Sequence, residues 1–143
     1  MSDQINAADL GLALRKGDEA SLFKWFLASF LFGKRIQQNI ARQTYRVIVE
    51  RHGRDTPLKL CHCSRAELVR MLGEGRYTRY DESTAQRLLA MCRKLQEEYG
   101  GRVAAIFEQS ASRRDLEKRL EAFKGVGPKT AEIFLRDAAQ AWA

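Results

Sequence analysis

The sequence predicts an all-α protein with a single domain, and three observations support this. The 143 residues fit one domain of roughly 100–200 residues. Only two prolines, Pro57 and Pro128, occur, and neither interrupts a segment with apolar residues at helical spacing. No segment alternates with the period of two that is typical of a strand. We therefore expect one orthogonal helical domain over residues 1–143, without an internal repeat.

Caps and glycines delimit the helices expected in the first half. Asp18 can cap a helix that contains the apolar run 22–32 and ends at Gly33. A second helix ends at Gly53, and its apolar residues recur at helical spacing: Ile36, Ile40, Val47 and Ile48. Two shorter helices follow, one beginning at Thr56-Pro57 and one at the capping-box sequence Ser64-Arg65-Ala66-Glu67.

Glycines also divide the second half. Residues 73–80 contain two glycines and no apolar period, which predicts a loop that is both basic and aromatic. Asp81 is expected to cap the next helix, which ends at Gly100-Gly101. A short helical turn over 103–107 and a helix from Ser112 come next. The chain then breaks at Gly125-Val126-Gly127, and Pro128 begins the last helix.

Charge and cysteine content restrict the class of protein. Lys plus Arg outnumber Asp plus Glu by 25 to 18, a net charge of +7 that favours a polyanionic partner. The apolar run 22–32 is shorter than the ~20 residues that a membrane helix needs, and residues 1–4 do not begin a secretory signal. We expect no membrane partner and a cytoplasmic, nucleoid-associated location. The three cysteines, an odd number, are expected to be free thiols: Cys61, Cys63 and Cys92.

Residues 120–135 combine the features of a tight turn and an anion site. Gly125 and Gly127 permit a tight turn and a close approach of a ligand to the backbone, and Val126 can anchor the turn between two helices. The first amides of the helix at Pro128 lack intrahelical acceptors and lie at the positive end of the helix dipole, so they can bind a phosphate. The alternative is a glycine-capped turn between two core helices.

This segment resembles the helix-hairpin-helix motif of DNA-binding proteins. Over about residues 20–137 the chain is similar to the endonuclease III family, within the helix-hairpin-helix superfamily of DNA glycosylases; the similarity lies in the apolar helix 27–32, the helix from 81 and the hairpin. The resemblance implies base-excision repair, with double-stranded DNA, including damaged DNA, as partner. It also implies a monovalent cation at the hairpin carbonyls. The four cysteines that hold an iron-sulfur cluster in many relatives are absent, so we expect no cluster.

The resemblance assigns roles to individual residues. Lys129 falls on the Schiff-base nucleophile of bifunctional family members, although in non-catalytic hairpins such a lysine only contacts phosphate. Tyr80 falls near the wedge that enters the duplex, with the packing of Tyr77 and Tyr80 on the core as the alternative. The expected DNA contacts are Lys34, Arg35, Arg76, Arg79, Tyr80, Lys124, Gly125, Val126, Gly127, Lys129 and Thr130.

One catalytic position of the family has no counterpart in this sequence. Family glycosylases carry an aspartate on the loop after the second helix of the hairpin, a position beyond Ala143. Asp137 is a poor substitute, because it is eight residues past Lys129 and thus about 12 Å along the helix axis. We therefore expect lyase chemistry rather than base excision. The alternatives are a non-catalytic DNA-binding module, a protein-interaction domain, and a homo-oligomer in which a second copy covers the open face.

Four residues in the first half of the chain are of types that bind zinc: His52, Cys61, His62 and Cys63. Structural zinc usually takes ligand pairs separated by two to four residues, and the adjacent Cys61-His62-Cys63 is too tight for that pattern. We expect no metal site from these residues and His52.

Overall fold

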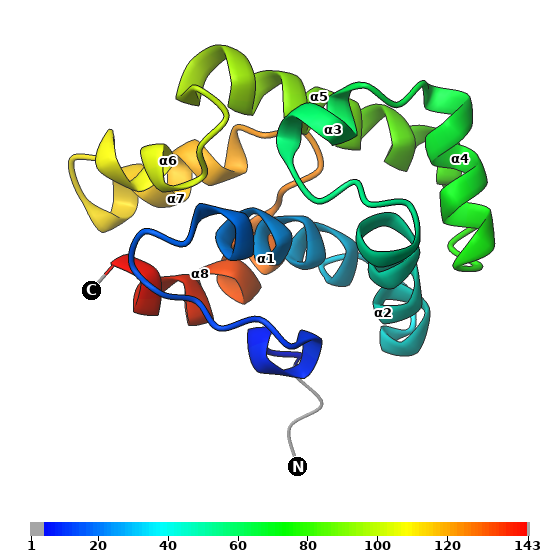
Figure 1. Cartoon of the computed structure of the whole chain (residues 1–143). Helices are drawn as coiled ribbons and strands as arrows, with labels where there is room; N and C mark the ends of the chain where they lie inside the picture. The colour runs from blue at the N-terminus through cyan, green and yellow to red at the C-terminus, as the bar shows by residue number, and fades with distance from the viewer. Residues whose placement is uncertain (1–4, 143) are drawn as a thin grey trace.

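The computed structural model describes the backbone of residues 5–142 and the side chains of residues 5–139. This part of the chain is helical and contains no strand (Figure 1). Its elements are η1 (Ala7–Leu10), α1 (Glu19–Phe32), α2 (Gln38–Arg46), the π-helical η2 (Val47–Arg51), α3 (Pro57–Cys61), α4 (Arg65–Glu74), α5 (Asp81–Tyr99), α6 (Ala104–Glu108), α7 (Arg113–Glu121) and α8 (Pro128–Trp142). No helix in the described residues is both long and apolar enough to cross a membrane.

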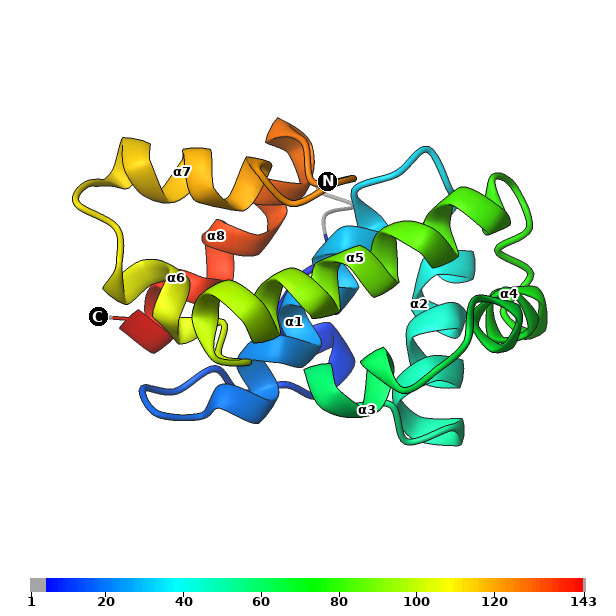
Figure 2. The same ribbon diagram turned by 90° about the horizontal axis from the view of Figure 1, so that it is seen from above.

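Helix α1 forms the centre of the core, and it packs against α2 and α8. Figure 2 shows α5 crossing over it on the other side. Its side chains from Trp25 to Leu31 are fully buried, as expected for a helix that is apolar on all sides. The Phe26 ring makes edge-to-face contacts with Phe123 and Phe134, with ring centroids 5.3 and 5.1 Å apart. The Trp25 indole N–H donates to the Phe134 carbonyl at 3.0 Å. These contacts fix the position of α8 and of the turn that precedes it.

Most helix ends lie where the sequence predicts them. The Asp18 carboxylate accepts from the Ser21 amide at 3.0 Å, and the Ser64 capping box is present. Ser112 caps α7, and Gly100 ends α5 in the left-handed conformation.

Two expectations about the elements were wrong, and one short helix was missed. Asp81 is the first residue of α5 rather than its cap: Tyr80 occupies the cap position with φ of 59°, and the chain enters the helix from a left-handed residue. Helix α4 continues to Glu74, so the loop before α5 is shorter than 73–80. The 3-10 helix η1, which a capping box from Asn6 begins, was not foreseen.

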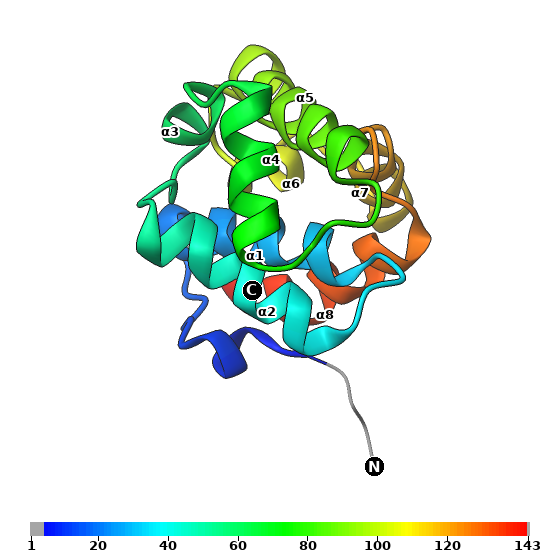
Figure 3. The same ribbon diagram turned by 90° about the vertical axis from the view of Figure 1, so that its right-hand side faces the viewer.

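Three connections lie on the same side of the molecule. They are loop 33–37 between α1 and α2, loop 75–80 before α5, and the α7–α8 turn, residues 122–127. Figure 3 shows all three on its right-hand side. The side chains agree with this view, because Lys34 reaches the α7–α8 turn and lines a pocket together with Arg79. The predicted site residues of distant segments therefore share one face.

Candidate functional site

The α7–α8 turn is held by its glycine and its apolar anchor. Gly125 has φ of 87°, and a Cβ atom on it would lie 2.7 Å from Cε2 of Phe30. Val126 is buried, and its amide donates to the Phe123 carbonyl at 3.1 Å. Ala131 is also buried, which lets α8 approach the rest of the core closely. The turn is thus a fixed structure in which only glycine fits at position 125.

The start of α8 presents main-chain amides that have no acceptor. Among the described residues, no carbonyl or side chain accepts from the amides of Gly127, Lys129 or Thr130. A Cβ atom on Gly127 would meet nothing within 4 Å, so the backbone is open here. Unpaired amides at the positive end of a helix dipole are suited to bind an anion.

Thr130 contributes only its backbone to this surface. Its side chain is buried, and a Cβ atom on Gly33 would overlap the Thr130 hydroxyl. The contact brings the end of α1 against the start of α8. Val126 is likewise buried, so both residues can contact a ligand through main-chain atoms alone.

Lys34 crosses from loop 33–37 to the α7–α8 turn. Its ammonium donates to the Gly125 carbonyl and lies 4.7 Å from the centroid of the Phe30 ring. Burial, together with the positive charge of Arg87, lowers the pKa of Lys34 below its ordinary value. The ammonium occupies the Gly125 oxygen that a monovalent cation at this turn would use. The ammonium would repel a second cation at the same oxygen, so these residues do not fit a bound monovalent cation.

Lys129 lines a small cleft together with a carboxylate. The cleft has a volume of about 210 Å³, and its polar lining includes Lys34, Lys129, Glu132 and Arg136. Glu132 is three residues beyond the exposed Lys129 and so lies on the same face of α8. It forms an ion pair with Arg136 at 3.4 Å. Sequence reasoning missed Glu132, although its i, i+3 spacing from the lysine was visible.

Asp137 was considered above as a substitute for a catalytic aspartate, but in the structure it has another role. Its carboxylate accepts a hydrogen bond from the Ala7 amide at 2.7 Å. It therefore fastens the N-terminal segment to α8.

Loop 33–37 and loop 75–80 enclose a basic pocket of about 250 Å³. Its lining includes Lys34, Arg35, Arg79, Tyr80 and Arg87. Tyr80 is 69% exposed, and the Arg79 guanidinium lies 5.3 Å from the centroid of its ring. Arg87, on α5, was not foreseen, because only the folded chain brings it beside Lys34.

Two other residues of loop 75–80 were considered above: Tyr77 lies in the core and Arg76 lies on the surface. Tyr77 is 1% exposed, and burial raises its pKa above the ordinary value. Arg76 is exposed with φ of 65°, and it is absent from the lining of the basic pocket. Both tyrosines line the basic pocket, but of the two only Tyr80 has an exposed side chain.

The ion pairs of the described residues include one at the Lys129 cleft, Glu132 with Arg136. None of them involves the cations of the two loops, the α7–α8 turn or Arg87. Around this face, the cations without such a pair are Lys34, Arg35, Arg76, Arg79, Arg87, Lys124 and Lys129. Cations outside these segments, such as Arg70 and Arg114, also lack one. What distinguishes this side is that its unpaired cations lie beside the unpaired amides.

The histidine and cysteine residues do not come together as a metal site. His52 pairs with Glu74, with Nε2 3.0 Å from Oε2, and no group of three His, Cys, Asp or Glu residues within the described chain is placed to hold a metal ion. The thiols of Cys61 and Cys92 hydrogen-bond to each other, and this contact lowers the pKa of Cys61 to about 7.

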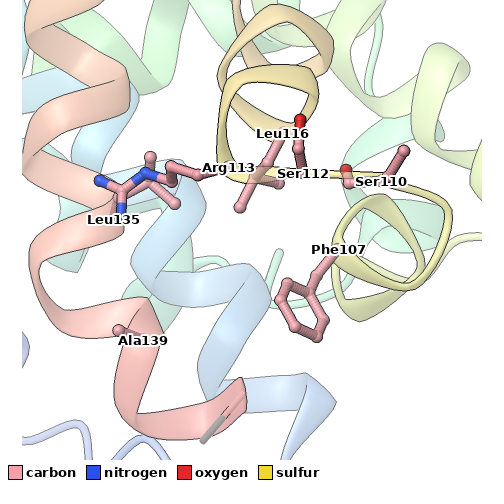
Figure 4. A pocket seen from close by; sticks show the side chains of 8 residues that line it. Phe107, Ser110, Ser112, Arg113, Leu116, Leu135 and Ala139 are labelled. Carbon is pink, nitrogen blue, oxygen red and sulfur yellow. The ribbon is translucent and has the colours of Figure 1, made fainter.

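An apolar hollow of about 410 Å³ lies between α6, α7 and α8 (Figure 4). Phe107, Leu116, Leu135 and Ala139 supply its apolar lining, and Arg113 is its one charged residue. The described residues that line the hollow include no carboxylate or amine that could act as a nucleophile.

Comparison with known proteins gives no assignment. Neither the known protein families nor the curated proteins contain a match to this chain.

Proposed function

We propose that the chain binds duplex DNA through the α7–α8 turn and that Lys129 forms a Schiff base with the aldehyde of an abasic site. The observation that carries this proposal is the group of three unpaired amides at the start of α8, beside an exposed lysine and on the face where unpaired cations gather. It accords with the resemblance of residues 120–135 to the helix-hairpin-helix motif.

The amides of Gly127, Lys129 and Thr130 bind one backbone phosphate. The cations of loops 33–37 and 75–80 contact phosphates on either side, which positions the duplex without reading its sequence. Tyr80 is the exposed aromatic residue of this face. It stacks in the gap that a missing or displaced base leaves in the duplex.

The reaction begins when the neutral amine of Lys129 attacks the aldehyde carbon of the open sugar. A C–N bond forms and the carbonyl π electrons move to oxygen, which takes up a proton to give a carbinolamine. Loss of water then gives the imine. Glu132 accepts the proton that the nitrogen loses and returns it to the departing hydroxyl. This role requires Glu132 to leave Arg136, a pair that is exposed and therefore weak.

The proposal extends to lyase chemistry and not to base excision. Stabilising the cationic sugar of base excision needs a carboxylate directed at the sugar. Asp137 is engaged by the Ala7 amide, and Glu132 serves the proton transfer at Lys129.

Borohydride trapping on a duplex with one abasic site tests the chemistry. Borohydride reduces the imine to a stable secondary amine, so the wild type is expected to give a covalent adduct. Lys129→Gln should give none while its affinity falls less than about tenfold, the scale of one lost phosphate contact. Lys124→Gln is the matched control: it removes another exposed lysine near the turn and should retain the adduct at saturating DNA.

Peptide mapping of the adduct makes the assignment specific. Among the described residues, Lys34 is the other amine that lines the cleft, so an adduct on the Lys34 peptide would overturn the assignment of Lys129. Duplex binding without any adduct would leave a non-catalytic binding module. Weak binding that does not depend on salt would point to a protein-interaction domain, because neutralisation of phosphates always gives a salt dependence.

A further inference from the structure

A second basic surface runs along α5, beside the face described above. It is a groove of about 610 Å³, here called the α5 groove. Its charged lining consists of four cations and no carboxylate: Arg65, Arg87, Arg93 and Lys124. Arg65 begins α4, and Lys124 belongs to the α7–α8 turn. Three segments of the chain therefore direct like charges into one groove.

The charges of the α5 groove are poorly compensated. Arg65 lies 3.6 Å from Glu82. Arg87, Arg93 and Lys124 take part in none of the ion pairs of the described residues. Like charges that share a groove repel one another, so this arrangement costs stability unless an anion binds there.

The uncharged lining distinguishes between nucleic-acid ligands. It consists of Ser83, Gln86, Leu89 and Ala90, so the described residues that line the groove include no aromatic side chain. Unpaired bases are held mainly by stacking on aromatic side chains, which this groove cannot provide. Backbone phosphates are bound by cations, and the groove supplies four of them.

The spacing along α5 fits a phosphate backbone. Arg87 and Arg93 are six residues apart, which places them about 9 Å apart along the helix axis. Phosphates of one strand follow each other at about 3.4 Å along the axis of the duplex. Two cations at this separation can each contact a different phosphate of the same strand.

We propose that the α5 groove binds the sugar-phosphate backbone of duplex DNA next to the part that the α7–α8 turn holds. The inference rests on the proposed function and extends its DNA surface. Two residues make the surfaces continuous: Lys124 lies in the turn, and Arg87 lines both the α5 groove and the basic pocket between the loops. The turn places the reacting site, and the groove holds the flanking backbone.

A double variant, Arg65→Gln with Arg93→Gln, tests the groove without altering the turn. Both side chains are exposed, so the variant is expected to fold normally. Each lost phosphate contact reduces the salt dependence of binding by about 0.9 in the log-log slope and weakens binding roughly eightfold at 0.1 M salt. We expect a slope less steep by about 1.8 and an affinity that is weaker by roughly 60-fold. The control is Arg70→Gln with Arg114→Gln, which removes the same charge from exposed positions outside the groove.

Hydroxyl-radical footprinting on a duplex with one abasic site locates the contact. The groove variant is expected to lose protection at a few nucleotides on one flank while protection around the abasic site remains. A groove variant that binds like the control, or that loses protection evenly, would overturn the groove and leave the turn in place. Failure of the wild type to bind duplex DNA would instead overturn the proposed function, and the groove proposal with it.

Discussion

The two glycines of the α7–α8 turn are expected to have different roles, and alanine substitutions separate them. Gly125 adopts φ of 87°, whereas Gly127 lies outside the left-handed region. An alanine Cβ at position 125 would lie 2.7 Å from Cε2 of Phe30 and 3.0 Å from Cδ of Arg87. At position 127 it would meet no atom within 4 Å. The first substitution disturbs the fold, and the second changes only the surface.

The magnitudes follow from these contacts. A left-handed conformation costs a residue with a Cβ roughly 1–2 kcal/mol, and forcing an extra methyl group into packed surroundings costs roughly 1–3 kcal/mol. Gly125→Ala should therefore lower the free energy of unfolding by about 2–5 kcal/mol. Gly127→Ala should change it by less than about 1 kcal/mol, because a compatible Gly-to-Ala change mainly restricts the unfolded chain.

Gly127→Ala, which leaves stability almost unchanged, is expected to weaken DNA binding. A methyl group on Gly127 stands beside amides that have no acceptor in the free protein, where a phosphate has to approach. Loss of one hydrogen bond to a charged group costs about 1.5–3 kcal/mol. Gly127→Ala should therefore bind duplex DNA roughly 10- to 150-fold more weakly at unchanged stability.

Urea denaturation followed by circular dichroism measures the stabilities, and fluorescence anisotropy with a labelled duplex measures the affinities. A Gly125→Ala protein as stable as the wild type would show that the turn tolerates a Cβ, and the packing argument would be wrong. Full DNA affinity in Gly127→Ala would remove the start of α8 from the binding surface.

Two further predictions concern Lys34 and the cysteine pair. At constant ionic strength, the wild-type affinity for duplex DNA should be the same in Li⁺, Na⁺ and K⁺, because the Lys34 ammonium already occupies the Gly125 carbonyl. Lys34→Met should bind more weakly and become sensitive to the cation; sensitivity of the wild type would contradict this role. Cys61 should react with iodoacetamide with a half-maximal rate near pH 7, because its pKa is lowered to about 7 by the hydrogen bond with Cys92. The folded state then favours the thiolate above that pH, so stability should rise between pH 7 and the higher pKa of the unfolded thiol. In denaturant or in Cys92→Ala the rate profile should move to higher pH, and an unmoved profile would refute the contact.

Features that depend on neighbours in sequence could be predicted from it. The caps of Asp18, Ser64 and Ser112 each involve a side chain and an amide three residues later, and the structure confirms all three. The start of α5 was misplaced because Tyr80 is left-handed. Tyr77, three residues earlier, is buried in the core, so the conformation of this loop is set together with tertiary packing.

The candidate site likewise combines features that the local sequence predicts with contacts between residues that are far apart in sequence. The glycines, Val126 and the start of α8 at Pro128 follow from local sequence, and the structure places them as expected. The hydrogen bond between Lys34 and Gly125 joins residues 91 positions apart, and Thr130 packs against Gly33, which is even more distant in sequence. No local pattern contains such contacts, because they arise from the packing of α1 against α8.

The distribution of ion pairs links the fold to the proposed activity. Carboxylates neutralise cations on other surfaces, as in Arg51 with Glu74, Arg102 with Glu108 and Arg113 with Glu117. The cations around the α7–α8 turn have no such pairs; others away from the turn, such as Arg70 and Arg114, also lack them. Exposed pairs contribute little to stability, about 0–1 kcal/mol, so their placement is only weakly constrained by folding. Concentrated charge, in contrast, accelerates and strengthens encounter with a polyanion. Unpaired cations beside the α7–α8 turn are therefore what the proposed binding requires, and the salt dependence of DNA binding measures their contribution.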